Sequence, residues 1–239
     1  MPIASIRNTQ HTTCSKLSSP IELFLKDSSV SVFGDLQSVR AVVTGSSSGI
    51  GRAIALELAA AGADVVVHCH QSVQQAEQVA SEILTSGRRS AVIQGDVRDV
   101  GKLDQLVDAA WAALGGIDIW VNNAGVDLLT GDKAKLPYAD KLEALLDIDV
   151  RSAVLLSKLV GERLAEQGRG SILNIGWDQS DRGMGGDSGE LFAAAKNAIM
   201  GFTRSLAVSL GPEVRVNCIA PGWIRTAWGE QASVSWQDR

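Results

Sequence analysis

The chain has 239 residues, of which 45% are hydrophobic and 21% charged, and these values suit one domain with a full hydrophobic core. Its net charge of −5 argues against a nucleic-acid partner, because phosphate contacts require clustered Lys and Arg side chains. No apolar run approaches the length of a membrane span, and the three cysteines have no spacing typical of a disulfide framework or a metal site. We therefore expect a cytoplasmic protein with no metal and no membrane partner.

Residues 1–38 differ in composition from the rest of the chain. They are rich in Ser and Thr and contain no acidic residue before Glu22. We predict an N-terminal extension that is partly disordered, in which Ser29–Phe33 alternates like a short strand. A transit peptide is a second interpretation of this segment. Residues 39–239 are predicted to form a single domain.

A glycine-rich turn, Thr44–Gly51, follows the apolar run Ala41–Val43. It opens into Arg52–Ala59, where Ile54 and Leu58 recur at helical spacing, so the pattern predicts strand, tight turn and helix. Its three glycines let the backbone approach a pyrophosphate, and the free N–H groups at the start of the helix face that anion. The turn therefore predicts a dinucleotide site.

The leading Thr and the three residues between the first two glycines make this turn similar to the cofactor loop of the classical short-chain dehydrogenases/reductases. The resemblance implies a doubly wound parallel sheet and an NAD(P) coenzyme. It also implies that the coenzyme is contacted by Thr44, Gly45, Ser47, Ser48, Gly49, Ile50 and Gly51.

Asp64–Cys69 is a nearly continuous β-branched run, which is typical of a parallel strand buried on both faces. An acidic residue at the end of this strand favours NAD, because it bonds the ribose 2′-hydroxyl and repels a 2′-phosphate. Cys69 stands there instead, so the sequence favours NADP, with NAD as the alternative. His70 and Ser72 are candidate phosphate contacts, although the stretch contains no Arg and could be only a polar turn.

A helix over Val73–Ser86 is predicted to lead into a third strand that ends near Asp96 and Val97. In the resembled family an Asp-Val pair at this point holds the adenine. The carboxylate accepts a hydrogen bond from the exocyclic amine, and the Val supplies an apolar wall. Another interpretation is that Asp96 caps a helix beginning near Val100, and both roles could hold at once.

A predicted helix over Leu103–Leu114 precedes a fourth strand, Ile117–Val121, which ends in Asn-Asn-Ala-Gly. Asn side chains can bridge neighbouring strand ends, while Ala and Gly leave room for the ribose of a cofactor. The resemblance therefore implies coenzyme contacts from Asn123, Ala124 and Gly125.

The resembled family has a catalytic tetrad of Asn, Ser, Tyr and Lys. This sequence has Asp149, Trp177 and Phe192 at the first three positions and keeps only Lys196. Tyr and Lys four residues apart share one helix face, where the ammonium lowers the pKa of the phenol. Phe192 has no proton to give, and positioned acid–base catalysis is typically worth about 10²–10⁴-fold in rate. Carbonyl reduction by the standard route is therefore not expected.

Two substitutes for the missing acid are open. Asp178, in the loop after the fifth strand, is one candidate, and some short-chain reductases of conjugated enoyl thioesters also use another residue near this loop. Lys196, alone or through a bound water, is the second candidate, with Asp149 holding it electrostatically. The alternative to a catalytic role for this loop is that Asp178 and Asp181 are solvated loop residues. Tyr138, the only tyrosine, is a further possible acid.

The sixth strand, Val214–Ala220, runs into a Pro-Gly turn. The resemblance implies that Pro221 and Gly222 pass over the nicotinamide, that Ile224 bonds its carboxamide and that Thr226 reaches the phosphates. It also implies that Lys196 bonds the nicotinamide ribose. Three tryptophans would line one side of the pocket and favour a flat or apolar substrate, or else pack in the core; they are Trp177, Trp223 and Trp228.

Together these patterns predict one Rossmann-like α/β domain with a doubly wound parallel sheet, and we expect it to lack the last strand of the family. The predicted function is NAD(P)-dependent hydride transfer to a carbonyl or conjugated enoyl substrate, with a non-standard proton donor. A catalytically inactive dinucleotide-binding partner or regulatory protein is the alternative. A small-molecule substrate and a homo-oligomer are expected.

Overall fold

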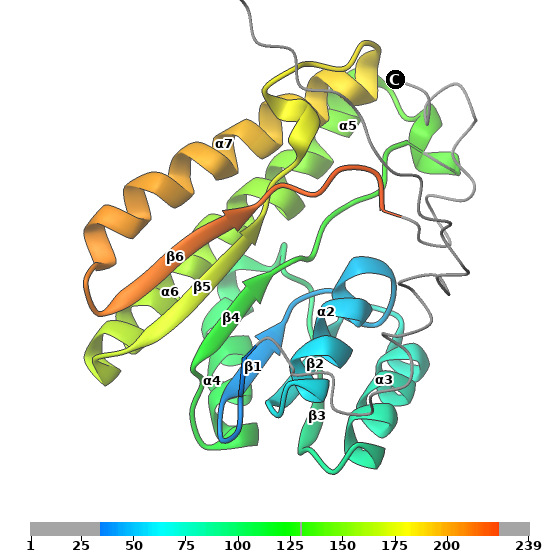
Figure 1. Cartoon of the computed structure of the whole chain (residues 1–239). Coiled ribbons are helices and arrows are strands. Elements are labelled where there is room, and N and C mark those ends of the chain that lie inside the picture. The colour runs from blue at the N-terminus through cyan, green and yellow to red at the C-terminus, as the bar shows by residue number, and fades with distance from the viewer. Residues whose placement is uncertain (1–33, 130, 225–239) are drawn as a thin grey trace, which may run out of the picture. The chain divides into compact units, whose positions relative to one another are not determined.

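The computed structural model describes residues 34–129 and 131–224, which contain one parallel sheet of six strands (Figure 1). The strands are β1 (Arg40–Val43), β2 (Asp64–Cys69), β3 (Ser90–Gln94), β4 (Ile119–Asn122), β5 (Gly170–Ile175) and β6 (Val214–Ile219). Their order across the sheet is β3-β2-β1-β4-β5-β6, and every neighbouring pair is parallel. The connections leave β1 and β4 in opposite directions, so the predicted doubly wound sheet is confirmed.

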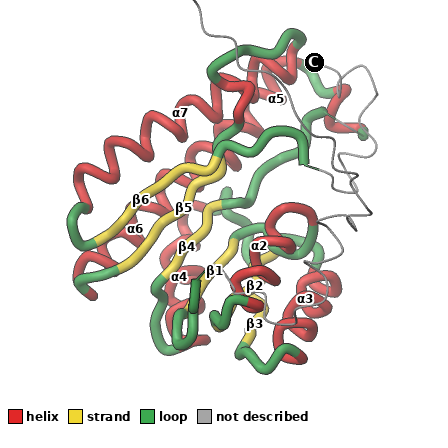
Figure 2. The backbone as a smooth tube through the Cα atoms, in the orientation of Figure 1, coloured by secondary structure: helices red, strands yellow, loops and turns green. Residues whose placement is uncertain are grey.

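Helices cover both faces of this sheet (Figure 2). They are α2 (Gly49–Ala60), α3 (Val73–Thr85), α4 (Leu103–Leu114), α5 (Tyr138–Leu145), α6 (Ser152–Gln167) and α7 (Asp187–Leu210). Shorter helical turns are η1 (Val100–Lys102), η2 (Asp132–Lys135), η3 (Leu146–Arg151) and η4 (Asp178–Ser180). One apolar cluster joins α4, α6 and α7 to one face of the sheet, and a second joins α2 and α3 to the other.

Local sequence explains these elements. All six residues of β2 are buried, as expected for a β-branched run between two helical layers. Helix α3 buries Ala76, Val79, Ala80 and Ile83, which recur at the spacing of one helix face. Helix α4 ends at Gly115, whose positive φ of 73° is a conformation that glycine adopts without a Cβ penalty.

The third strand is shorter than predicted. It ends at Gln94, and the next N–H group, from Gly95, donates to the Cys69 carbonyl and turns the chain out of the sheet. The helical turn that follows has Asp99 at its N-cap position. The alternative in which Asp96 caps a helix is therefore wrong, because the backbone places Asp99 there.

No seventh strand follows β6 among the described residues, which end at Ile224. The predicted strand Ser29–Phe33 lies outside the described residues. From Asp35 onward the described residues form one compact unit. Within the described part of the chain, none of the helices combines the length and apolarity needed to cross a bilayer.

A buried chain of polar side chains ties β4 and β5 to two helices. The Asn122 amide donates to Ser157 Oγ and Asn174 Oδ1, both at 2.8 Å, and the Asn174 amide donates to Thr203 Oγ1 at 3.0 Å. The Trp120 indole N–H donates to Asn122 Oδ1 at 2.8 Å. Asn side chains thus bridge neighbouring strand ends, as the sequence predicted.

Replacing Asn174 by Leu tests this network. The substitution keeps the branching and the number of side-chain heavy atoms, but one Asn122 N–H loses its acceptor and Thr203 Oγ1 loses its donor, and each such lost bond in a buried site costs about 1–3 kcal/mol. We expect the free energy of unfolding in urea to fall by about 2–4 kcal/mol. Asn217→Leu, at an exposed position of β6, is the matched control and should change it by less than about 1 kcal/mol. Equal effects at the two sites would contradict a stabilising network.

Candidate active site

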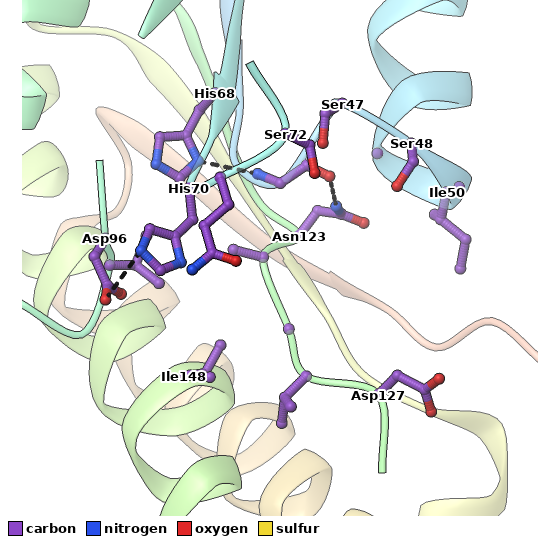
Figure 3. Close-up of a pocket in the computed structure, with 18 of the residues that line it drawn as sticks. Ser47, Ser48, Ile50, His68, His70, Ser72, Asp96, Asn123, Asp127 and Ile148 are labelled. Carbon is purple, nitrogen blue, oxygen red and sulfur yellow. Dashed lines mark hydrogen bonds and ion pairs between the residues drawn. The ribbon is translucent and has the colours of Figure 1, made fainter. Parts of the chain in front are cut away.

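A cavity of about 750 Å³ lies at the carboxyl ends of β1 to β4 (Figure 3). Most of its wall comes from four segments that are far apart in the sequence. Of the predicted coenzyme contacts, it contains Gly45, Ser47, Ser48, Gly49, Ile50, Gly51, His70, Ser72, Asp96, Val97, Asn123, Ala124 and Gly125. The predicted dinucleotide segments therefore share one cavity.

The glycine-rich turn has the shape that a dinucleotide needs. A Cβ on Gly45 would come within 2.9 Å of Ala124 Cα, and one on Gly51 would come within 2.3 Å of the Gly45 carbonyl oxygen. Gly49 begins α2 with a positive φ of 56°, and a Cβ there would meet no protein atom within 4 Å. Its Cβ position is therefore open, and Ser48 at the N-cap makes no side-chain capping bond. The start of α2 can thus offer N–H groups to an anion, which fits a pyrophosphate.

Thr44 is a correction to the sequence-based assignment. It is buried and does not line the cavity. Its hydroxyl accepts the backbone N–H groups of Asn123 and Ala124, both at 2.9 Å. The Asn123 amide in turn donates to the carbonyl oxygens of Thr44 and Gly45. Thr44 therefore holds the backbone after β4 against the glycine-rich turn.

His68 was missed by sequence reasoning, although a histidine in an otherwise β-branched strand was the available signal. Its Nδ1 accepts the Gly45 N–H at 3.1 Å, so the imidazole fixes the glycine-rich turn. Its Nε2 is buried without a hydrogen-bond partner among the described residues. Burial lowers the pKa of the imidazole from 6.5 to about 4, and the ring is therefore neutral at physiological pH.

A second cavity, of about 190 Å³, lies at the end of β5 under the turn that follows β6. Its charged lining residues are Lys196 and Asp149, whose Nζ and Oδ1 atoms are 2.9 Å apart. Lys196 also donates to the Ile175 carbonyl at 3.2 Å, and Asp149 Oδ2 accepts the Val126 N–H at 3.0 Å. The ion pair that the sequence suggested is therefore present, and both partners make further hydrogen bonds.

A single π-helical turn, η3, carries Asp149 to this position between α5 and α6. Such turns insert an extra residue into a helix and are frequent at functional sites. The close fit is visible at Gly125, where a Cβ would come within 2.9 Å of Asp149 Oδ1. The turn thus presents the Asp149 carboxylate to Lys196, and Gly125 leaves room for it.

The Ser and Tyr positions of the tetrad carry aromatic rings. Trp177 and Phe192 pack edge to face with their centroids 6.1 Å apart, and both line the second cavity. The remaining wall includes Pro221, Gly222, Trp223 and Ile224. The predicted turn residues are therefore at the site, while Thr226 and Trp228 lie outside the described residues.

Asp178, predicted as a substitute acid, is not among the residues that line either cavity. Its carboxylate lies against Gly222 of the second cavity, where a Cβ would come within 3.2 Å of Asp178 Oδ2. Its Oδ2 accepts a hydrogen bond from Gln179, and its Oδ1 is buried without a partner among the described residues. Asp181 is exposed, which agrees with its interpretation as a solvated loop residue.

Tyr138 is exposed at the start of α5, with its hydroxyl 3.4 Å from a Glu190 carboxylate oxygen. It lines neither cavity. The structure therefore does not support Tyr138 as a substitute acid. No group of three His, Cys, Asp or Glu side chains suited to a metal ion occurs among residues 34–129 and 131–224.

The pH dependence of stability tests His68. The unfolded chain binds a proton at this imidazole below pH 6.5, but the folded chain does so only below about 4. The contribution of neutral His68 to the free energy of unfolding is thus fully present above pH 6.5 and is lost as the pH falls toward 4. The total loss is about 3 kcal/mol. In His68→Asn the amide oxygen can still accept the Gly45 N–H but does not titrate. Urea denaturation at pH 7, 6 and 5 should show a shallower loss for this variant, and identical slopes would contradict the assignment.

The chain matches the family model described as short chain dehydrogenase over residues 39–235. It is 38% identical over 189 residues to the 3-oxoacyl-[acyl-carrier-protein] reductase of Synechocystis sp., an alignment covering 78% of this chain and 74% of that protein.

Two solved structures are similar. One is a short chain dehydrogenase from Burkholderia cenocepacia in complex with NADP, with a TM-score of 0.73, 38% identity, and 81% and 78% of the two chains covered. The other is a dehydrogenase/reductase from Sinorhizobium meliloti, with a TM-score of 0.72, 33% identity, and 81% and 75% covered. This chain therefore belongs to the short chain dehydrogenase family of NAD(P)-dependent oxidoreductases.

Proposed function

We propose that this chain transfers hydride between NADP and a small-molecule substrate bound in the 190 Å³ cavity. The observation that carries the proposal is that the two cavities adjoin, since Ile50, Asn123 and Phe192 line both. A dinucleotide that extends along the larger cavity from the glycine-rich turn can therefore present its nicotinamide to the smaller one. The coenzyme supplies the hydride chemistry, and the chain supplies binding and orientation.

NADP is the coenzyme we propose, with NAD as the alternative. The end of β2 offers no carboxylate to a ribose 2′-hydroxyl, whereas His70 and Ser72 line the cavity there. The Ser72 hydroxyl makes no capping bond to α3, although Ser72 is its N-cap residue, so it is available to a ligand. The similar structure from Burkholderia cenocepacia, solved with NADP, supports this choice.

Lys196 is the group we propose for proton transfer. Its ammonium has three protons, and two of them are directed to Asp149 and the Ile175 carbonyl, which leaves one for a substrate or a water. Asp149 fixes its position. The aromatic walls, Trp177 and Phe192, suit a flat substrate with a carbonyl or a conjugated enoyl group.

A catalytically inactive dinucleotide-binding partner or regulatory protein is the second candidate. One observation favours it: Trp177 and Phe192 occupy the two tetrad positions that would otherwise carry hydroxyl groups at the site. This candidate predicts coenzyme binding without turnover. For either function we propose a homo-oligomer in the cytoplasm, as the resemblance to the family and the spacing of the cysteines led us to expect.

The first test is titration with NADPH and NADH by nicotinamide fluorescence, followed by a panel of ketones and enoyl thioesters. We expect Lys196→Met to lower kcat on any accepted substrate by at least about 100-fold, because the positioned proton donor is lost. Asp178→Asn should change kcat by no more than about twofold, since Asp178 lines neither cavity. Turnover that survives in Lys196→Met, or disappears in Asp178→Asn, would contradict the assignment.

The double variant Trp177→Ser/Phe192→Tyr separates the two candidate functions. It returns hydroxyl groups to both tetrad positions beside Lys196, and we expect ketone reduction to rise by at least about 10-fold. If the parent binds NADPH but reduces no substrate while the double variant does, the inactive partner is the better description. If the double variant folds and binds NADPH but gains no ketone reduction, the loss of these hydroxyls does not limit activity.

A further inference from the structure

We propose that Arg98, which follows β3, is the residue that selects NADP by binding its 2′-phosphate. The inference rests on the proposed NADP-dependent function and adds a residue that sequence reasoning did not consider. Neither the glycine-rich turn nor the end of β2 contains an arginine suited to this role in the sequence, and only the fold brings one to the site.

Strand pairing places Arg98 beside the end of β2. Cys69 and Gln94 are partners at the ends of β2 and β3, and the Gly95 N–H donates to the Cys69 carbonyl at 2.9 Å. The Gln94 amide also donates to the His70 carbonyl at 3.0 Å. The segments after the two strands therefore run together, and His70 and Arg98 line the same cavity.

The Asp96 carboxylate holds the Arg98 guanidinium. Nε of Arg98 donates to both carboxylate oxygens at 3.0 Å, and Nη2 donates to Oδ2 at 2.6 Å. The Arg98 backbone N–H adds a fourth hydrogen bond to Oδ1. His70 Nε2 lies 3.5 Å from Oδ2, and Figure 3 shows His70 and Asp96 facing each other. Asp96 thus fixes the orientation of Arg98.

These bonds change what Asp96 can do. Hydrogen bonds from the Arg98 side chain lower the pKa of the Asp96 carboxyl from 3.8 to about 2, so it is charged throughout the physiological range. Arg98 neutralises that charge locally, and both carboxylate oxygens are already engaged. The expected bond from the adenine amine to Asp96 would therefore have to share an oxygen with Arg98.

The remaining edge of Arg98 is available for a ligand. Its side-chain hydrogen bonds within the described part of the chain all come from Nε and Nη2, so Nη1 has none, and the side chain is 49% exposed on the cavity wall. The Asp147 carboxylate also attracts the guanidinium electrostatically. A planar guanidinium with free N–H groups matches the geometry of a phosphate. NAD offers only a hydroxyl at the 2′ position, which gains much less from a cation. The site therefore favours the coenzyme with the 2′-phosphate.

The test compares Arg98→Gln with the parent and with Arg52→Gln. Arg52 is the matched control because it is also half-exposed and paired with a carboxylate, that of Glu82, but lines neither cavity. Calorimetric titration with adenosine 2′,5′-bisphosphate and with 5′-AMP isolates the adenosine end. NADPH and NADH are titrated by fluorescence in parallel.

We expect Arg98→Gln to weaken binding of adenosine 2′,5′-bisphosphate and NADPH at least 10-fold, and to leave 5′-AMP and NADH within twofold. Arg98→Lys, which keeps the charge but not the planar fork, should fall in between, and Arg52→Gln should match the parent. If Arg98→Gln weakens the binding of NADPH and NADH equally, Arg98 contacts the adenine and not the 2′-phosphate. If Arg98→Gln leaves the affinity for NADPH unchanged, Arg98 makes no contact with the coenzyme. Either result overturns the proposal.

Failure of the two proposals can be told apart. A parent that binds NADH more tightly than NADPH overturns the role of Arg98 but leaves a dinucleotide-dependent function intact. A parent that binds neither coenzyme overturns the proposed function and this inference together. Thermal unfolding followed by circular dichroism verifies that each variant is folded before its affinity is compared.

Discussion

The close approach of β1 and β4 at their carboxyl ends is the constraint on which the coenzyme cavity depends. The Thr44 hydroxyl binds the backbone after β4, and Gly45 packs so tightly on Ala124 that any side chain would collide. Since the chain leaves these two strands in opposite directions, a crevice opens between the two halves of the sheet. The His68 imidazole fixes the same turn from β2. The coenzyme cavity thus depends on the strand order and on the hydrogen bonds made by the Thr44 hydroxyl and the His68 imidazole.

The two ends of the site differ in chemistry. The glycine-rich turn binds through backbone groups, which do not depend on the tetrad, so coenzyme binding and proton transfer are separable in this fold. At the substrate end, aromatic rings surround one buried ion pair. Isolating Lys196 and Asp149 from water is costly, and the bonds to Ile175 and from Val126 help to offset that cost. An intact charged pair in an apolar cavity therefore favours a retained use for Lys196.

At the adenosine end of the proposed site, the Asp96 carboxylate and the Arg98 guanidinium form a second ion pair. Asp96 would repel a 2′-phosphate if it stood alone, but Arg98 neutralises it and presents the rest of its guanidinium to the cavity. In the proposed site, selection of the coenzyme would depend on two neighbouring strand ends rather than on one residue after β2. The same pairing explains how a chain with a net charge of −5 can offer a cation to an anionic ligand.

The sequence by itself determined the order of strands and helices, the glycine-rich turn and the Asn-Asn-Ala-Gly segment. These depend on local periodicity and on backbone positions that only small residues can occupy, such as Gly45. Most predicted coenzyme contacts accordingly line one cavity. Only the tertiary structure showed that the Thr44 hydroxyl binds the backbone after β4, that Asp178 packs against Gly222, and that Arg98 and His70 share the Asp96 carboxylate. The direction of a side chain beyond a strand end depends on backbone turns and on neighbours from other strands, which no local pattern encodes.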